Sequence, residues 1–299
     1  MCSSDLGALR SVTARHANGR ALTVNVSQIV LCAGAIETTR LLLLIDAQHG
    51  NRPFANCDAL GRYFHDHISA PAAKMHARDA RKLNRLAGFR FAGSTMRSLR
   101  FELSPVAQHR DTSPSAFGHI SFETEGTSGF DSLREFLRTL QRNGRFDTRS
   151  AMRVLADMPY LAKSAYWRYV HKQLCWPSPA DYALHVVAEQ LPRRENRISL
   201  ASEKDSLGLP LAAIDWRVSP SDGRAFSVYR RNFDRFWSRS GLNEAVELEW
   251  LVKEDVENGG PVPLGGDVYH PGGSTRMGSD ARHAVVDGDL RTFAIPNLW

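Results

Sequence analysis

One short stretch near the end of the chain, "DVYHPGGSTRMG" at residues 267–278, combines a histidine with a turn that has few bulky side chains. His270 can exchange a proton near neutral pH, because an imidazole has an unperturbed pKa of about 6.5. The Gly272–Gly273 pair lets the backbone come close to another group, since glycine has no Cβ. We interpret the stretch as a catalytic base held against a flat or bulky cofactor. The alternative is an ordinary surface loop.

Two further pairs of polar residues have spacings that suggest chemistry. His65 and His67, in "FHDH", point the same way on a strand, and in principle they could be two metal ligands. Metal sites need three or four ligands, and no third residue has a suitable spacing, so we predict no metal site. Asp287 and Asp289, in "VVDGDLR", resemble an acid–base pair, but two carboxylates around a glycine are more typical of a turn.

The elements that would hold a cofactor come first in the chain. Residues 8–33 read as a strand pair with an Asn-Gly turn, and the apolar run "IVLCAGA" at 29–35 predicts a buried strand at a sheet centre. The next segment, "ETTRLLLLIDA", is expected to be a helix with Glu37 or Thr38 near its N-terminus. A buried strand, a glycine turn and a helix N-terminus form a site for a phosphate-bearing cofactor, although most α/β proteins contain such a unit.

The middle of the chain predicts a different architecture. Residues 70–130 alternate as antiparallel strands do, and strands resume at 182–191 and 196–202. Helices are expected over 133–140, 150–173 and 221–238. The first is predicted from the helical spacing of Leu133, Phe136, Leu137 and Leu140, and the last carries an aromatic stripe that we assign to the core: Phe226, Tyr229, Phe233, Phe236 and Trp237. This order of elements fits a cofactor domain interrupted by a substrate domain.

Composition excludes several classes of protein. The 299 residues carry a net charge of +6, but the basic residues are scattered, which disfavours nucleic-acid binding. The longest apolar run, "LLLLI", is far shorter than the roughly 20 residues of a membrane span. The four cysteines show no CxxC spacing, so reduced thiols without a structural metal are expected. Localisation stays open, with the cytoplasm favoured.

Four segments, in this order, resemble the glucose–methanol–choline (GMC) flavoprotein oxidoreductases: "IVLCAGAIETTRLLLL", "LGRYFHDHI", "EQLPRRENRISLASEKDSLGLP" and "YHPGGSTRMG…AVVDGDLRTFAIPNLW". The resemblance implies FAD as the cofactor and His270 as the active-site histidine. It also implies flavin contacts from two sets of residues, which are Ala33, Gly34 and Ala35 in the first segment and Gly272, Gly273 and Ser274 in the last. His67 matches a linker near the flavin, and Asn196 with Arg197 matches a turn that sets strand register.

The resemblance also predicts the fold and the domains. We expect a mixed α+β and α/β chain, in which an incomplete Rossmann-like FAD-binding domain (1–69 and 265–299) is interrupted by a substrate domain (70–264) with a largely antiparallel sheet and helices. The family's G-x-G-x-x-G unit does not occur here, and its second active-site residue would lie beyond Trp299. Both ends look cut, and residues 1–6 look like a translated sequencing adapter, so we expect this chain alone to be inactive.

The expected activity is the oxidation of a CH–OH group in an alcohol or sugar. Hydride would pass from the carbinol carbon to flavin N5 while His270 takes the hydroxyl proton. Substrate identity and electron acceptor leave no readable mark in the sequence. The alternatives are a non-catalytic carbohydrate- or ligand-binding module built on the antiparallel block, and an inactive fragment.

Overall fold

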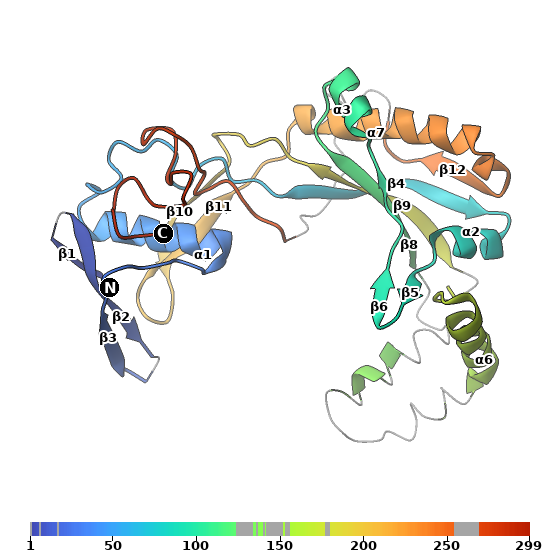
Figure 1. The fold of residues 1–299 in the computed structure, drawn as a ribbon, viewed down its shortest axis with the longest axis horizontal. Helices are drawn as coiled ribbons and strands as arrows, with labels where there is room; N and C mark the ends of the chain where they lie inside the picture. The colour runs from blue at the N-terminus through green and yellow to red at the C-terminus, as the bar shows by residue number, and fades with distance from the viewer. Residues whose placement is uncertain are drawn as a thin grey trace. The chain divides into compact units, whose positions relative to one another are not determined.

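The structure, a computed structural model, describes residues 2–5, 7–16, 18–123, 157–176, 180–253 and 269–299, with isolated positions between 134 and 156. The chain divides into two compact units. Unit 1 comprises Met1–His67, Gln190–Val218 and Asp267–Trp299, and unit 2 comprises Ile68–Glu189 and Ser219–Gly266. Figure 1 shows the elements of both units. Residues 190–218, which the sequence placed inside the predicted segment 70–264, therefore cluster with unit 1.

Unit 1 begins with a three-stranded antiparallel sheet in the order β1 (Cys2–Asp5), β2 (Ala8–Arg15), β3 (Ala21–Asn25). The turn between β2 and β3 contains Asn18 and Gly19, and Gly19 has φ +85°, a left-handed conformation that glycine adopts without strain. The hairpin predicted from the Asn-Gly pair is confirmed.

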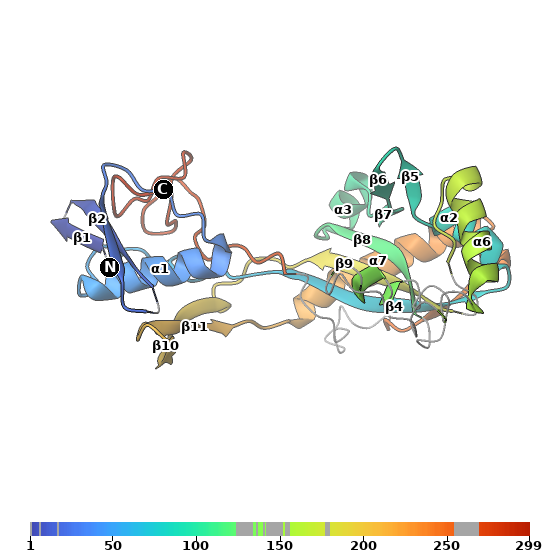
Figure 2. The same cartoon turned by 90° about the horizontal axis from the view of Figure 1, so that it is seen from below.

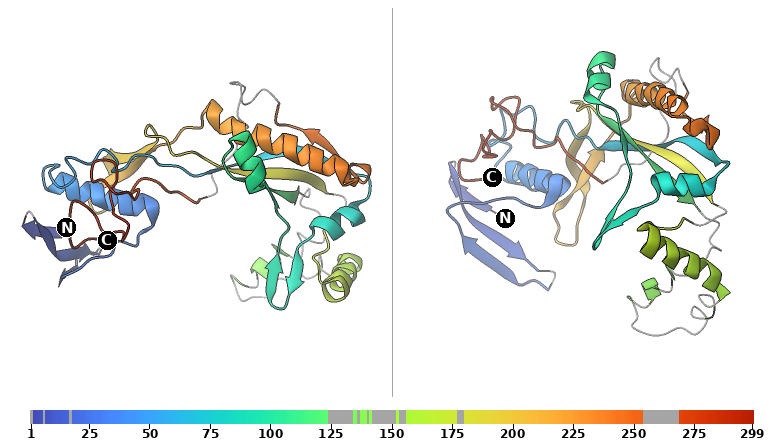
Figure 3. Two further views of the ribbon diagram at one scale, coloured as in Figure 1. Left: turned by 45° about the horizontal axis from the view of Figure 1, so that its top comes forward. Right: turned by 45° about the vertical axis from the view of Figure 1, so that its right-hand side comes forward.

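Helix α1 (Gly34–Gln48) lies between this sheet and the antiparallel hairpin of β10 (Arg197–Lys204) and β11 (Pro210–Asp215) (Figures 2 and 3). Its buried side joins a core made by Leu9, Leu42, Ile45, Phe54, Ala59, Val285, Ile295 and Leu298. The helix starts at Gly34, earlier than the predicted Glu37 or Thr38. The N-cap residue is Ala33, which has no side-chain acceptor, so the usual sequence signal for a helix start is missing.

The apolar run at 29–35 does not form a buried central strand, so this prediction is wrong. Ile29 and Leu31 bond to the end of the chain, with distances of 3.0 Å from Ile29 N to Asn297 O and 2.7 Å from Leu31 N to Trp299 O. Ile29 and Leu31 pack toward the core, whereas Val30 is 66% exposed and Cys32 is also exposed. A continuous apolar run is buried only when both faces of the strand are covered, and the described residues cover one.

Unit 2 is built on a five-stranded sheet in the order β12-β4-β9-β8-β7. The strands are β12 (Val246–Trp250), β4 (His67–Ala77), β9 (Asp181–Glu189), β8 (Ala116–Glu123) and β7 (Phe101–Glu102). The pairs β4–β12, β7–β8 and β8–β9 are antiparallel, which confirms the largely antiparallel sheet. The smaller elements are α2 (Ala80–Ala87), the hairpin β5 (Arg90–Ala92) and β6 (Thr95–Arg97), α3 (Pro105–Asp111), α6 (Met158–Tyr166) with a π-helical turn (Trp167–His171), and a 3-10 turn (Leu242–Glu244).

The long helix of unit 2 is α7 (Pro220–Arg239), which runs beside β12 in Figure 1. It starts at a capping box in which the Ser219 N–H donates to Asp222 Oδ2 at 2.7 Å. Four of the five aromatic residues assigned to the core are buried, but Phe236 is 48% exposed. Phe236 lies at the edge of the stripe, next to Phe101 on β7, so its assignment to the core is wrong.

In the predicted helix at 133–140, the described positions (134, 135 and 137–139) are helical, whereas Leu133, Phe136 and Leu140 lie outside the described residues. In the predicted helical region 150–173, the described part is helical from Met158 to His171. Among the helices that the structure describes, none combines the length and hydropathy that crossing a bilayer requires.

Candidate functional site

Unit 1 brings together four residues from two distant parts of the chain: His65, Asp66 and His67, and His270. We call them the histidine cluster. The Asp66 side chain is at its centre and only 3% of the residue is exposed. Asp66 Oδ1 accepts the backbone N–H of His67 at 2.6 Å, and both carboxylate oxygens lie at 3.0 and 3.2 Å from the backbone nitrogen of His270. A buried carboxylate thus fixes the backbone of the predicted base.

The imidazole of His270 is oriented by its neighbour. The His67 and His270 rings meet edge to face, with 5.7 Å between their centroids and planes at 88°. His270 is exposed, and within the described residues its ring nitrogens have no hydrogen-bond partner. A ring that is exposed and unpaired is free to bond a ligand, as a proton acceptor must be.

The Gly272–Gly273 pair has a partner inside the protein. Residues His65 and Gly272 exchange backbone hydrogen bonds of 3.1 and 2.9 Å. A Cβ on Gly273 would overlap the Tyr63 carbonyl oxygen and come within 2.5 Å of His65 Nδ1, and Gly273 has φ +85°. A Cβ on Gly272 would lie 3.3 Å from His65 Nε2. The close backbone approach that the sequence suggested is therefore made, in this structure, to the Tyr63 carbonyl and the His65 ring.

Ser274 anchors the same loop to α1. Its hydroxyl lies 2.7 Å from that of Thr39, and both residues are buried. Thr39 also donates to the Ala35 carbonyl at 2.7 Å. The Ser274 side chain therefore points into the protein, while the backbone N–H groups of Gly273 and Ser274 have no acceptor within the described residues.

The N-terminus of α1 is open. Ala33 and Gly34 are exposed, the N-cap makes no side-chain hydrogen bond, and a Cβ placed on Gly34 meets nothing within 4 Å. Gly34 has φ +79°, so glycine is favoured there by conformation alone. Free N–H groups and the positive end of the helix dipole suit a phosphate group. The N–H of Ala33 donates to Thr38 Oγ1 at 3.3 Å, so the N–H groups of Gly34 and Ala35 are the ones open to such a group.

Two residues interpreted as structural have that role. The side chain of Asn196, fully buried, accepts the Arg217 N–H at 3.1 Å and donates to the Arg217 carbonyl at 3.3 Å, which fixes the register of β10 against β11. Asp287 Oδ1 accepts the N–H groups of Asp289 at 3.0 Å and Arg291 at 2.9 Å, as in a turn. Across the described residues, no group of three or more His, Cys, Asp or Glu side chains could hold a metal. Cys32, Cys57 and Cys175 are free thiols.

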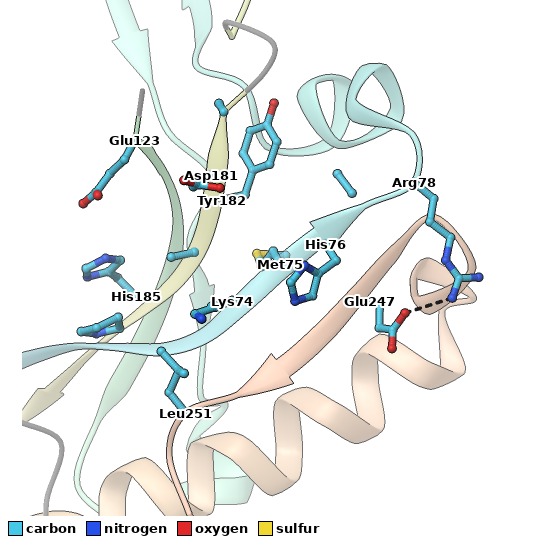
Figure 4. A pocket seen from close by; sticks show the side chains of 14 residues that line it. Lys74, Met75, His76, Arg78, Glu123, Asp181, Tyr182, His185, Glu247 and Leu251 are labelled. Carbon is cyan, nitrogen blue, oxygen red and sulfur yellow. Dashed lines mark hydrogen bonds and ion pairs between the residues drawn. The ribbon is translucent and has the colours of Figure 1, made fainter. Parts of the chain in front are cut away.

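Unit 2 has its own pocket of about 780 Å³ (Figure 4). It lies over β4, β9 and β12 and carries charges of both signs. Arg78 pairs with Glu247 at 3.0 Å within the lining, and His76 pairs at 2.8 Å with Glu249, which does not line the pocket. Lys74, Glu123, Asp181 and His185 complete the polar lining. The lining therefore offers both hydrogen-bond donors and acceptors to a ligand.

Sequence reasoning missed two features. Asp66 was considered only as the spacer between two histidines, and its bond to a residue 204 positions away leaves no local signal. In unit 2, His119 and His185 face each other across β8 and β9, with stacked rings whose centroids are 5.6 Å apart. Burial lowers the pKa of both imidazoles, and the neighbouring His185 and Arg100 lower the pKa of His119 further.

Comparison with known proteins supports the family suggested by the sequence. Residues 192–299 match a family model described as "GMC oxidoreductase". No curated protein matches the chain. Solved structures that are similar to this chain include formate oxidase from Aspergillus oryzae RIB40, in a study of mutation and FAD modification (16% identity, TM-score 0.49), and a second structure of formate oxidase (15% identity, TM-score 0.48). In both cases the match covers 97% of this chain and 52% of the other.

The chain thus spans about half the length of these solved structures. The matched residues 192–299 include His270, Gly272, Gly273 and Ser274, so the similarity to the family model covers one side of the histidine cluster directly. Residues 192–299 of this chain therefore resemble the GMC oxidoreductases.

Proposed function

We propose that the whole protein is an FAD-dependent oxidoreductase that acts on the CH–OH group of an alcohol or sugar, with His270 as the base. One observation carries the proposal. Within the segment that matches the family, His270 presents an exposed imidazole without a partner among the described residues, while its backbone is held by the buried carboxylate of Asp66. A general base needs this combination of a fixed position and a free ring nitrogen.

Some of the predicted FAD-binding residues of unit 1 have groups that could contact FAD, and others have only a structural role. Gly34 and Ala35 would hold the phosphates of FAD at the open N-terminus of α1. The unpaired N–H groups of Gly273 and Ser274 would face the ring system, whereas the Ser274 hydroxyl, already bonded to Thr39, would only hold the loop. When bound, FAD supplies the acceptor for the hydride that leaves the carbinol carbon.

The chain's own residues have two tasks in this chemistry. His270 takes the hydroxyl proton of the substrate at a ring nitrogen, and the His67 ring, edge-on at 5.7 Å, limits the orientations open to it. The backbone around His270 stays fixed because Asp66 accepts its N–H. The proton acceptor and the atoms that position it are therefore all part of unit 1.

The proposal is tested by recording the absorption spectrum of the purified full-length protein. We expect flavin absorption bands that survive gel filtration, and bleaching of these bands when an alcohol or sugar is added without oxygen. A panel of alcohols and sugars with an artificial dye acceptor then identifies the substrate class. Protein that carries no flavin, or flavin that no CH–OH compound reduces, would contradict the proposal.

A second candidate function is a non-catalytic carbohydrate- or ligand-binding protein, and the polar pocket of unit 2 is the observation in its favour. In that case sugars would bind the full-length protein with no flavin present, and Lys74→Ala or Asp181→Ala would weaken that binding. Calorimetric titration of the flavin-free protein with sugars separates the two functions.

A further inference from the structure

We propose that Asp66 is the positioning residue of the active-site base: its carboxylate fixes the backbone at His270 and thereby the direction of the imidazole. The inference rests on the proposed function, because it assumes that His270 takes the substrate proton. It goes beyond that function by assigning a catalytic contribution to a residue that touches neither the substrate nor the cofactor.

Asp66 is buried, so its carboxylate depends on the hydrogen bonds that it accepts. A buried carboxylate is costly unless hydrogen-bond donors surround it. Here the donors are backbone N–H groups, from His67 at 2.6 Å and from His270 at 3.0 and 3.2 Å, and no cationic side chain pairs with Asp66 within the described residues. Hydrogen bonds to an ionised acceptor are roughly twice as strong as neutral ones. The carboxylate is thus committed to the two histidine backbones.

The backbone before His270 needs such an anchor. Tyr269 has φ +59°, a left-handed conformation that costs an L-residue energy, and it is 85% exposed, so packing does little to hold it there. The next anchors of the loop act further along, at Gly272 through His65 and at Ser274 through Thr39. In the described part of the chain, Asp66 is the group that holds the N–H of His270 itself.

Asp66 also sets the second imidazole. By accepting the N–H of His67 it fixes the start of β4, and the His67 ring then meets the His270 ring edge-on. The direction of a side chain follows from the position of its backbone and its neighbours. One carboxylate therefore determines both the backbone of the base and the ring that packs against it.

The experiment compares three variants of the full-length flavoprotein by anaerobic stopped-flow reduction, with rates expressed per bound FAD. Asp66→Ala should lower the limiting rate of flavin reduction by about 10- to 100-fold, because a misplacement of about 1 Å costs on the order of 100-fold. The substrate dissociation constant should change by less than roughly threefold, since substrate binding energy does not come from Asp66. This split between rate and affinity is the signature of positioning.

Asp66→Asn is the conservative variant. The amide keeps one oxygen acceptor but turns an N–H₂ donor toward a backbone N–H, so a fall of about 3- to 10-fold is expected, the loss of one hydrogen bond. If Asp66→Ala does not fold, Asp66→Asn decides the matter, and a wild-type rate in that variant overturns the inference.

Thr39→Val is the matched control. It removes a buried hydrogen bond to the same loop, the 2.7 Å contact with Ser274, but leaves the N–H of His270 in place. We expect it to lower stability without lowering the reduction rate. If Thr39→Val and Asp66→Ala lower the rate of flavin reduction equally, Asp66 has only a structural role. A wild-type rate in His270→Ala would refute the proposed function, whereas a slow His270→Ala with a fast Asp66→Ala would refute this inference alone.

Discussion

Gly273→Ala should destabilise the protein more than an alanine at another glycine that also has a positive φ but has free space around its Cβ position. Gly273 has φ +85°, and an L-residue in the left-handed region costs roughly 1–2 kcal/mol. The new Cβ would also overlap the Tyr63 carbonyl oxygen and the His65 ring, and overpacking of this kind costs typically about 1–3 kcal/mol. The two effects together predict a loss of about 2–5 kcal/mol in the free energy of unfolding.

Gly34→Ala is the control for this prediction. Gly34 has a similar φ of +79°, but a Cβ there meets nothing within 4 Å, so only the conformational cost of roughly 1–2 kcal/mol applies. The difference between the two variants isolates the overlap with Tyr63 and His65. Adding His65→Ala to Gly273→Ala should recover part of the loss, because the ring is removed while the Tyr63 carbonyl stays.

The assay is equilibrium unfolding in urea with the flavin removed, comparing midpoints at an unchanged slope. No recovery in the double variant would show that the His65 ring does not impose the glycine. Equal losses for Gly273→Ala and Gly34→Ala would show that neither the Tyr63 carbonyl nor the His65 ring imposes it. The close approach at this loop would then have to be explained by another partner.

Two further predictions concern unit 2. Phe226→Ala should cost about 3–5 kcal/mol because Phe226 is 1% exposed, whereas Phe236→Ala, at 48% exposed, should cost less than about 1 kcal/mol; similar urea midpoints for the two variants would contradict the placement of α7. Burial lowers the pKa of His119 and His185 below the unfolded value near 6.5, so the folded state binds fewer protons at these residues than the unfolded state. The free energy of unfolding should therefore be highest above about pH 6.5 and should fall as the pH drops below that value. Replacing both histidines with Gln should make the melting temperature depend less on pH between pH 7 and 5 than in the unmodified protein. An unchanged pH dependence would refute this account.

Local patterns predicted the elements whose signals are local. Two such elements are the Asn18–Gly19 turn and helix α7, which was predicted from the spacing of its aromatic residues. Both follow from backbone conformation and helix geometry, which act over a few residues. The run at 29–35 failed because its burial depends on what lies beside it, and the described chain covers only the side of Ile29 and Leu31.

The candidate site was predictable only in part. His270 was identified from its own neighbourhood, since the glycine and hydroxyl residues beside it form a recognisable motif. Asp66 was not identified, because its role depends on a hydrogen bond from His270, which lies 204 residues away in the sequence. The Gly272–Gly273 pair signals a close approach but not its partners, which in the structure are the Tyr63 carbonyl and the His65 ring.

The most direct test of the account is the rate of flavin reduction in His270→Ala and His270→Asn of the full-length enzyme, followed without oxygen by stopped flow. Loss of a positioned base should slow reduction by roughly 10²- to 10⁴-fold, with FAD still bound. Asn should recover little, because an amide can hydrogen-bond the hydroxyl group but cannot take its proton. Reduction of His270→Ala at near the wild-type rate would contradict the account and place the base elsewhere in the protein.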